Sequence, residues 1–305
     1  MSYRHILLAL LVAVVWGFNF VIIKLGLTQV PPFSFAFLRY VFAGLPLFLF
    51  VKRPAIPIGM VVAIGLSMGL VKFSFLFVGV SLGVNAGLGS LVLQSQAFFT
   101  IILSLFIFKQ RLTVQQISGV LIAFTGIFFI GFEMHTESSL MGLICVLCAA
   151  FSWAISNILV RKAGPIDSFA LVIWTSLVPP LPLLGMSYAF EGGGVNNFTN
   201  IWQKLDWTGF ACILYIAWGA TWVGGTVWAK LMRLYPPSTV APYSLLIPVF
   251  AFLSGWVVLG ETVSINVMLA SCVVFIGLAV NQWPSRSQTK AQLDQNAAAE
   301  THEAT

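Results

Sequence analysis

Long apolar runs dominate the pattern of this chain, and short polar segments separate them. Most runs hold about 20 residues, the length that an α-helix needs to cross about 30 Å of hydrocarbon. Many of the connections contain proline, glycine or charge, which are common where helices end. The pattern predicts an all-α, polytopic membrane protein with ten transmembrane helices, at residues 5–26, 33–51, 57–78, 84–108, 114–132, 140–160, 168–190, 207–229, 236–259 and 264–283.

Composition agrees with this interpretation. Of the 305 residues, 59% are hydrophobic and only 8% are charged, too little charge to keep a soluble domain of this size dispersed. The apolar run from Ile6 to Ile23 is longer than the core of a usual signal peptide, so we interpret it as an uncleaved first helix. Residues 284–305 are polar and rich in alanine and glutamine, which predicts a disordered cytoplasmic tail.

The basic residues indicate orientation. If both termini are cytoplasmic, eleven lysines and arginines fall on the inside and only Lys204 falls in an outside loop, where most of the acidic residues also lie. This asymmetry obeys the positive-inside rule, so we predict cytoplasmic termini. The net charge of +6 sits in short gaps between apolar runs and does not indicate a nucleic-acid partner. The inside set is Arg4, Lys52, Arg53, Lys109, Arg111, Arg161, Lys162, Lys230, Arg233, Arg286 and Lys290.

The two halves of the chain resemble each other. The segment from Trp16 to Lys24 matches the segment from Trp153 to Arg161, with the same spacing from tryptophan to cation. The segments from Phe108 to Leu112 and from Leu259 to Val263 align at an offset of 151 residues. At this same offset, Gly126 corresponds to Gly277.

We therefore predict one repeat at residues 1–133 and a second at 140–283, each with five spans. Because five is odd, the second repeat must enter the membrane inverted. Inverted repeats are typical of secondary transporters, whose binding site lies near the midplane between the repeats. Shared composition among apolar helices is the alternative explanation of the similarity.

Several segments together resemble the EamA-type family of the drug/metabolite transporter superfamily, over essentially residues 1–283. They are Trp16–Phe20, Leu38–Tyr40, Leu91–Thr100, and Pro248 with Gly260–Glu261. Within that family the chain looks most like bacterial exporters of amino acids and of cysteine or O-acetylserine type metabolites. The resemblance implies ten helices, a central cavity that opens alternately to either side, and a location in the bacterial inner membrane. One departure is that the family's Gly-Glu-Arg-Leu after the fourth span is here Lys109–Leu112, so its acid survives only as Glu261.

Three cations lie in or at the ends of apolar runs, where a charge is costly: Lys24, Arg39 and Lys72. Arginine offers a planar fork that suits a carboxylate, and lysine offers a point charge. We predict that Arg39 and Lys72 form an anion-binding pair on the outer side of a cavity. Snorkelling toward the headgroups is the alternative, and for Lys24, at the end of its run, we prefer an anchoring role.

Neutral polar and aromatic side chains complete the predicted substrate site. Gln94 and Gln96 stand about 200° apart on one helix, so one of the two is expected to join helices instead. The other predicted substrate-binding residues are Asn19, Trp153, Asn157 and Tyr243. We expect no catalytic residue, metal site or cofactor, since Cys145 and Cys148 have no second ligand pair and are better explained by packing.

No aspartate or glutamate lies in the middle of a predicted span, and no Walker-type motif is present, so we expect neither a buried proton-coupling acid nor direct use of ATP. These features predict a secondary transporter, not an enzyme, that exports small metabolites such as amino acids or cysteine-pathway compounds by alternating access. The expected partners are the solute and the lipid bilayer, with the chain acting as a monomer. The alternatives are a permease for other amphiphilic metabolites or drugs and, from another class, a lipid flippase or a membrane enzyme.

Overall fold

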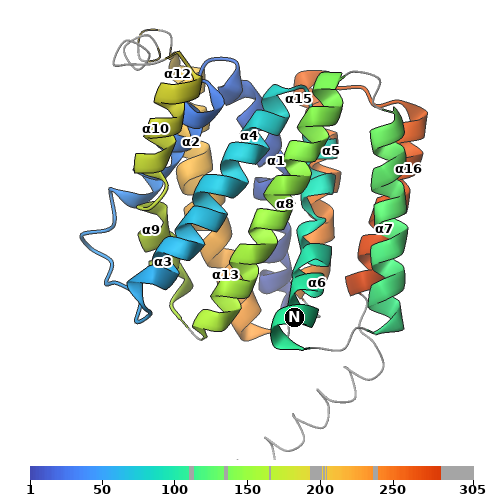
Figure 1. Ribbon diagram of the computed structural model, residues 1–305, viewed down its shortest axis with the longest axis horizontal. Helices are drawn as coiled ribbons and strands as arrows, with labels where there is room; N and C mark the ends of the chain where they lie inside the picture. The colour runs from blue at the N-terminus through green and yellow to red at the C-terminus, as the bar shows by residue number, and fades with distance from the viewer. Residues whose placement is uncertain are drawn as a thin grey trace, which may run out of the picture.

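The computed structural model describes residues 1–109, 113–133, 137–164, 166–192, 201, 203, 205–235 and 240–282. All regular elements in these ranges are helical, and no strand occurs among them. The long helices stand side by side with their ends gathered at two opposite faces (Figure 1). The predicted tail at 284–305 and much of the loop between Glu191 and Asp206 lie outside the described residues.

Each predicted apolar run corresponds to a helical segment. In the first half these are α1 (Tyr3–Leu27), α2 (Pro32–Gly44), α3 with η1 and α4 (Ile58–Ile64, Gly65–Val71, Lys72–Ser81), α5 with α6 (Ala86–Leu93, Gln96–Phe108), and α7 (Val114–Glu133). In the second half they are α8 (Glu137–Ala163), α9 with α10 (Ser168–Ser176, Pro180–Phe190), α12 with η2 and α13 (Trp207–Leu214, Tyr215–Gly224, Gly225–Leu234), η3 with α15 (Ala241–Leu245, Leu246–Leu259), and α16 (Ile265–Gln282).

Length and hydropathy support a multi-pass membrane protein. Seven helical segments in the described ranges are long and apolar enough to cross a membrane, and Tyr243–Leu259 and Ile265–Val280 form two shorter apolar helices. Helix α2 ends earlier than the apolar run that contains it. Pro46 has no N–H to donate to the carbonyl of Phe42, and the indole Nε1 of Trp218 donates to that oxygen instead, at 3.1 Å.

Several segments change helix type partway along. Segments η1 and η2 are π-helical stretches inside otherwise α-helical spans, and such stretches often occur at functional sites. Helices α5 and α6 are separated at Gln94 and Ser95, where the backbone forms turns. The break between α9 and α10 coincides with Pro179 and Pro180, which cannot continue a helical hydrogen-bond ladder. These interruptions place irregular backbone in the interior of the protein.

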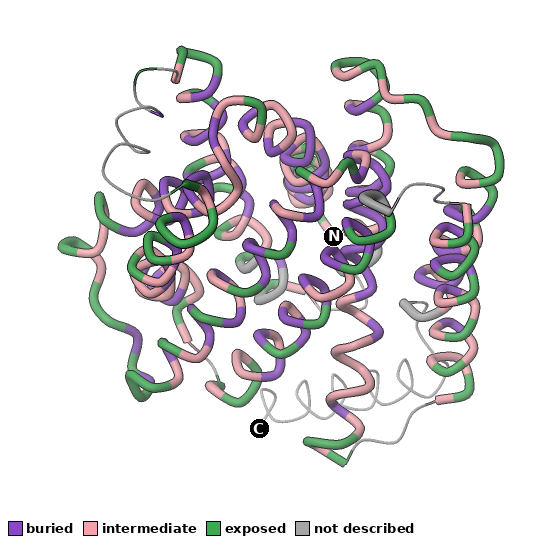
Figure 2. Tube along the Cα trace, turned by 45° about the horizontal axis from the view of Figure 1, so that its top comes forward, coloured by how far each residue is buried: buried purple, intermediate pink, exposed green. Residues whose placement is uncertain are grey.

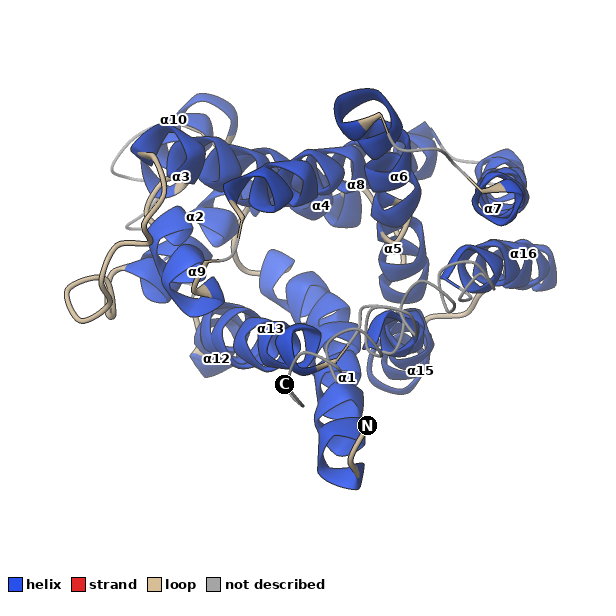
Figure 3. Cartoon of the chain, turned by 90° about the horizontal axis from the view of Figure 1, so that it is seen from below, coloured by secondary structure: helices blue, strands red, loops and turns tan. Residues whose placement is uncertain are grey.

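Helices α7 and α16 form a close pair at one side of the molecule (Figure 3). A Cβ atom on Gly126 would lie 2.8 Å from the carbonyl oxygen of Ala270, and one on Gly277 would lie 2.5 Å from the backbone nitrogen of Ala123. Only glycine permits this approach at either position. Elsewhere the buried positions line the sides on which helices meet, and exposed apolar positions face outward (Figure 2).

Candidate functional site

Two buried cations contact one aromatic ring. Arg39, on α2, and Lys72, the first residue of α4, are only 5% and 4% exposed. The Cζ atom of Arg39 lies 3.8 Å from the ring centroid of Phe73, and the Nζ atom of Lys72 lies 4.5 Å from the same centroid. Lys72 also lies 3.6 Å from the ring centroid of Trp153 on α8. The structure thus brings together three of the predicted site residues, Arg39, Lys72 and Trp153.

Among the described residues, the side chain of Arg39 makes one hydrogen bond. Its Nη2 atom donates to the hydroxyl of Thr221 on η2, at 2.9 Å, and that hydroxyl donates to the carbonyl of Ile216, at 2.8 Å. The Thr221–Ile216 bond spans five residues, as the π-helical backbone allows. The Nε and Nη1 atoms of Arg39 are buried and have no hydrogen-bond partner among the described residues. The guanidinium therefore keeps donors that suit an anionic ligand.

The ammonium of Lys72 contacts mainly apolar groups. It donates to the Sδ of Met68, a weak acceptor, at 3.9 Å. The faces of Phe73 and Trp153 attract a cation, an interaction worth about 0.5–2 kcal/mol. Burying an ion costs several kcal/mol even after the protein relaxes. The aromatic rings offset only part of this cost, so an anion beside Lys72 would stabilise the site.

The acidic side chains that the structure describes are engaged elsewhere, at the ends of the helices. Glu261 contacts Lys24 and Ala86, Glu191 accepts from Phe33 and Ser34, Asp206 from Gln29 and Gly209, Asp167 from Phe169, and Glu133 from Asn266. The single ion pair in the described part of the chain is that of Lys24 with Glu261. No described carboxylate therefore neutralises Arg39 or Lys72.

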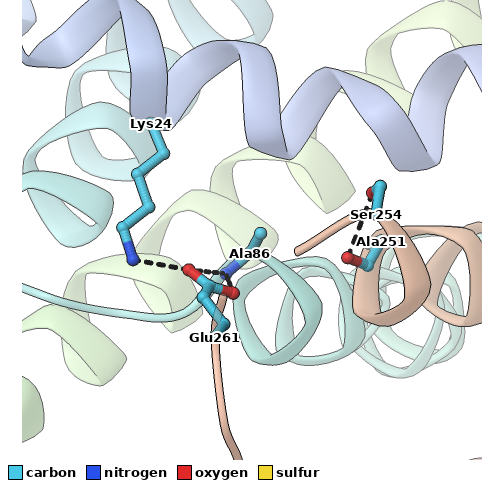
Figure 4. Close-up of polar contacts among 5 residues, drawn as sticks. All are labelled: Lys24, Ala86, Ala251, Ser254 and Glu261. Atoms are coloured by element: carbon cyan, nitrogen blue, oxygen red, sulfur yellow. Dashed lines mark hydrogen bonds and ion pairs between the residues drawn. The ribbon is translucent and has the colours of Figure 1, made fainter. Parts of the chain in front are cut away.

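Lys24 does not act as the free anchor that the sequence predicted. Its Nζ atom lies 2.5 Å from Oε1 of Glu261, whose side chain is 8% exposed (Figure 4). Glu261 also accepts a hydrogen bond from the backbone nitrogen of Ala86, at 2.9 Å, and thus caps the first turn of α5. This correction follows from the fold, which brings the end of α1 beside the loop after α15. One carboxylate joins α1, α5 and that loop.

Three of the predicted polar residues hydrogen-bond to neighbouring helices. Asn157 on α8 donates to Oε1 of Gln96, at 2.7 Å, and to the hydroxyl of Thr100, at 3.1 Å. Gln94 donates to the carbonyl of Ser244, at 3.1 Å. The sequence assigned a joining role to only one of the two glutamines, but both have it. The helix also breaks between them, so the angle of about 200° expected for one continuous helix does not apply.

Asn19 and Tyr243 are the remaining two predicted residues. Asn19 is buried on α1, and its Oδ1 atom accepts no hydrogen bond from the described residues. Tyr243 packs against the cluster of Ala9, Leu231 and Val240, near the N-terminal end of α1. The sequence pattern does not indicate a role for Phe73 or Thr221. Neither is unusual in its sequence context, and each gains its role from a helix that is distant in the chain.

A lateral apolar groove of about 740 Å³ lies between the third helical segment and α8. Exposed side chains such as Leu66, Phe75 and Phe151 form its walls. Its two hydroxyls are already bonded: Ser67 donates to the carbonyl of Ala63, and Ser152 donates to the carbonyl of Ser67. The groove therefore suits acyl chains of the bilayer and offers little to a polar solute.

Apolar helices with buried cations between them are typical of multi-pass membrane proteins that move solutes. Comparison with known proteins makes the class specific. The chain belongs to the EamA-like transporter family, which matches residues 4–132 and 140–282. Membership in a transporter family indicates that the protein is not an enzyme.

Two curated relatives are both named "Probable amino-acid metabolite efflux pump". The protein from Salmonella typhimurium is 38% identical over 299 residues, covering 96% of this chain and 99% of the relative. The protein from Escherichia coli is 37% identical over 287 residues, covering 92% and 95%. A solved crystal structure has the same fold, with a TM-score of 0.59 and 17% sequence identity over 92% of this chain and 98% of that one. Together these findings support a metabolite exporter.

Proposed function

We propose that the protein is a secondary carrier that exports small carboxylated metabolites, amino acids or their derivatives, across the bacterial inner membrane. The observation that carries the proposal is the buried guanidinium of Arg39, which lies beside Lys72 and has two nitrogens with no hydrogen-bond partner in the part of the chain that the structure describes. The planar fork of arginine matches a carboxylate. Cysteine-pathway compounds fall in this class, and the names of the two bacterial relatives, probable amino-acid metabolite efflux pumps, support the class.

Packing supports the proposal of two inverted repeats, at 1–133 and 140–283, with five spans each. Gly126 faces Ala270 and Val274, while Gly277 faces Gly119 and Ala123. The two sets of contacts are equivalent: adding 151 to the number of the glycine in the first set, and subtracting 151 from the numbers of its partners, gives the second set. A pseudo-two-fold axis between the repeats explains this reciprocity.

Backbone conformation supports the same relationship. Lys109 follows α6 with a φ of 52°, and Gly260 follows α15 with a φ of 62°, again 151 residues apart. The π-helical segments η1 and η2 overlap at this offset as well. The two halves share local distortions as well as apolar composition, which weighs against composition alone as the source of the sequence similarity.

Orientation follows from charge in this proposal. With cytoplasmic termini, the helix ends near Arg4, Lys52, Arg53 and Arg161 lie at the inner face, and the Lys24–Glu261 pair lies at the outer face. Counting from the outer helix ends at 1.5 Å per residue, Arg39 lies about 10 Å deep and Lys72 about 14 Å deep. The cation pair is thus on the outer side of the membrane centre.

Alternating access would reach this pair from either side by moving one group of helices against another. Arg39 is well placed for such coupling, because α2 belongs to the first half and its partner Thr221 belongs to the second. The indole of Trp222, on the same π-helical segment, donates to the carbonyl of Ala43 on α2, at 2.9 Å. Binding of a carboxylate at Arg39 therefore affects the contact between α2 and η2 directly.

We propose that the gradient of the substrate, by export or exchange, drives transport. This rests on the positions of the described acids, which all lie at helix ends and not beside the cation pair. In vesicles without a substrate gradient, an imposed pH gradient should move no solute. Transport that follows the pH gradient would reject this mode of coupling.

The lateral groove does not favour a lipid flippase. A flippase needs polar groups along the path of the headgroup, because a charged or polar headgroup is costly to bury in apolar surroundings. The hydroxyls of Ser67 and Ser152 in the groove already donate to backbone carbonyls. Export through the cation site remains the better supported function.

The test is counterflow in proteoliposomes that contain the purified full-length protein, with labelled cysteine, O-acetylserine, glutamate and N-acetylglutamate as probes. Wild type should exchange at least one of them, and Arg39→Ala should lower its rate by more than about tenfold, the effect of losing a charged contact. Arg53→Ala, at the inner end, is the matched control and should keep the wild-type rate. Absence of exchange with every probe would overturn the function, and full exchange by Arg39→Ala would overturn the site.

A further inference from the structure

The cation pair restricts the charge of the substrate, an inference that rests on the proposed function. Arg39 and Lys72 share the ring of Phe73, and both are at least nine-tenths buried. The described carboxylates are engaged with other partners at the helix ends. The site therefore brings together two buried basic side chains whose positive charge no described acid balances.

We propose that this site selects solutes of net negative charge, with two anionic groups or one dianionic group shared between Arg39 and Lys72, and discriminates against zwitterions. One anionic group would take the free donors of Arg39, and the second charge would lie beside the ammonium of Lys72. Dicarboxylic amino acids, N-acylated amino acids and phosphorylated metabolites have this chemistry. A zwitterionic amino acid has one anionic group but no net negative charge.

The surroundings of the pair disfavour an ammonium group. Two like charges in a poorly solvated site repel a third. An aromatic face would be the usual place for a cation, but Lys72 already lies over Trp153 and Arg39 over Phe73. An acylated or otherwise uncharged amino group fits better.

Binding of four probes of similar size tests the proposal: glutamine, N-acetylglutamine, glutamate and N-acetylglutamate. Their net charges near neutral pH are 0, −1, −1 and −2, which follows from ordinary carboxyl and amino pKa values. The fluorescence of the full-length protein in detergent provides a readout, because Trp153 contacts Lys72. We expect N-acetylglutamate to bind at least about tenfold more tightly than glutamine, and both monoanions to have intermediate affinities.

Lys72→Gln should weaken the binding of N-acetylglutamate much more than that of N-acetylglutamine. Lys72→Arg should restore the preference for the dianion. Lys52→Gln, an exposed lysine outside the apolar spans, is the matched control and should change neither. If the Lys72→Gln protein does not fold, the test uses Lys72→Arg and the four-probe series on wild type.

The outcomes separate this inference from the proposed function. Equal affinity for the four probes, or tighter binding of glutamine, overturns the inference and leaves an exporter of zwitterions. Failure of all four to bind while other solutes exchange also overturns the inference alone. Failure to bind together with absence of counterflow for every probe overturns both.

Discussion

Lys24 and Glu261, 237 residues apart in the chain, form an ion pair with 2.5 Å between Nζ and Oε1. The same carboxylate accepts the backbone N–H of Ala86, so it joins the two halves of the protein at one end. In the proposed orientation that end is outside. The ion pair is a structural reason for an acid at Glu261, in the second copy of the Gly-Glu motif, although the first copy, Lys109–Leu112, has none.

Substitutions at Glu261 should separate its two bonds. Glu261→Gln keeps an oxygen for the N–H of Ala86 and loses the charge, whereas Glu261→Ala leaves that N–H without an acceptor. We expect Glu261→Ala to be the less stable of the two by about 1–3 kcal/mol, the cost of an unsatisfied buried donor. Thermal unfolding in detergent measures the difference. Equal stability of the two variants would show that the bond to Ala86 contributes nothing.

Thr221 should act as a positioning residue for Arg39. Thr221→Val removes the hydroxyl that accepts from Nη2 while keeping the shape of the side chain. We expect substrate affinity to fall about tenfold, the size of one charge-assisted hydrogen bond, with little change in the amount of folded protein. Thr221→Ser should restore affinity, which a purely structural role would not require.

Thr125→Val is the matched control for this experiment. The hydroxyl of Thr125 also bonds within its own helix, to Leu121, but the residue is exposed on α7. Affinity should stay at the wild-type value. Equal losses from Thr125→Val and Thr221→Val would contradict the assignment of Thr221 to Arg39.

Lys109 holds a backbone conformation that suits glycine, with a φ of 52° after α6. A residue with a Cβ atom in the left-handed region costs about 1–2 kcal/mol. Lys109→Gly should therefore stabilise the protein by about 1 kcal/mol, and Gly260→Ala, at the equivalent position after α15, should destabilise it by a similar amount. Unfolding temperatures in detergent provide the comparison, and a lower temperature for Lys109→Gly would contradict it.

The helical fold could be predicted because a membrane imposes a simple rule on sequence. Each span needs about 20 apolar residues, and every predicted run coincides with a helical segment. The rule does not predict where a helix ends within an apolar run. Helix α2 ends at Gly44 because of Pro46 and because indole groups from η2 take over its last carbonyls, which depends on packing.

The candidate site could be predicted in part for a similar reason. Arg39 and Lys72 stood out because a charge inside an apolar run needs an explanation. Neutral polar residues carry no such signal about their partners. Gln96 and Asn157 therefore entered the predicted substrate site, although in the structure they hydrogen-bond to each other. The partnership of Lys24 with Glu261 was missed because it exists only after folding.

The central claim is that Arg39 and Lys72 hold an exported anion. Its most direct test is the efflux of labelled N-acetylglutamate from proteoliposomes under an imposed membrane potential. An inside-negative potential favours the exit of each negative charge by about 2.3 kcal/mol per 100 mV. We predict that it accelerates efflux in wild type, that an inside-positive potential slows it, and that Arg39→Ala shows no efflux in either case. Efflux that is independent of the potential, or that persists in Arg39→Ala, would contradict the claim.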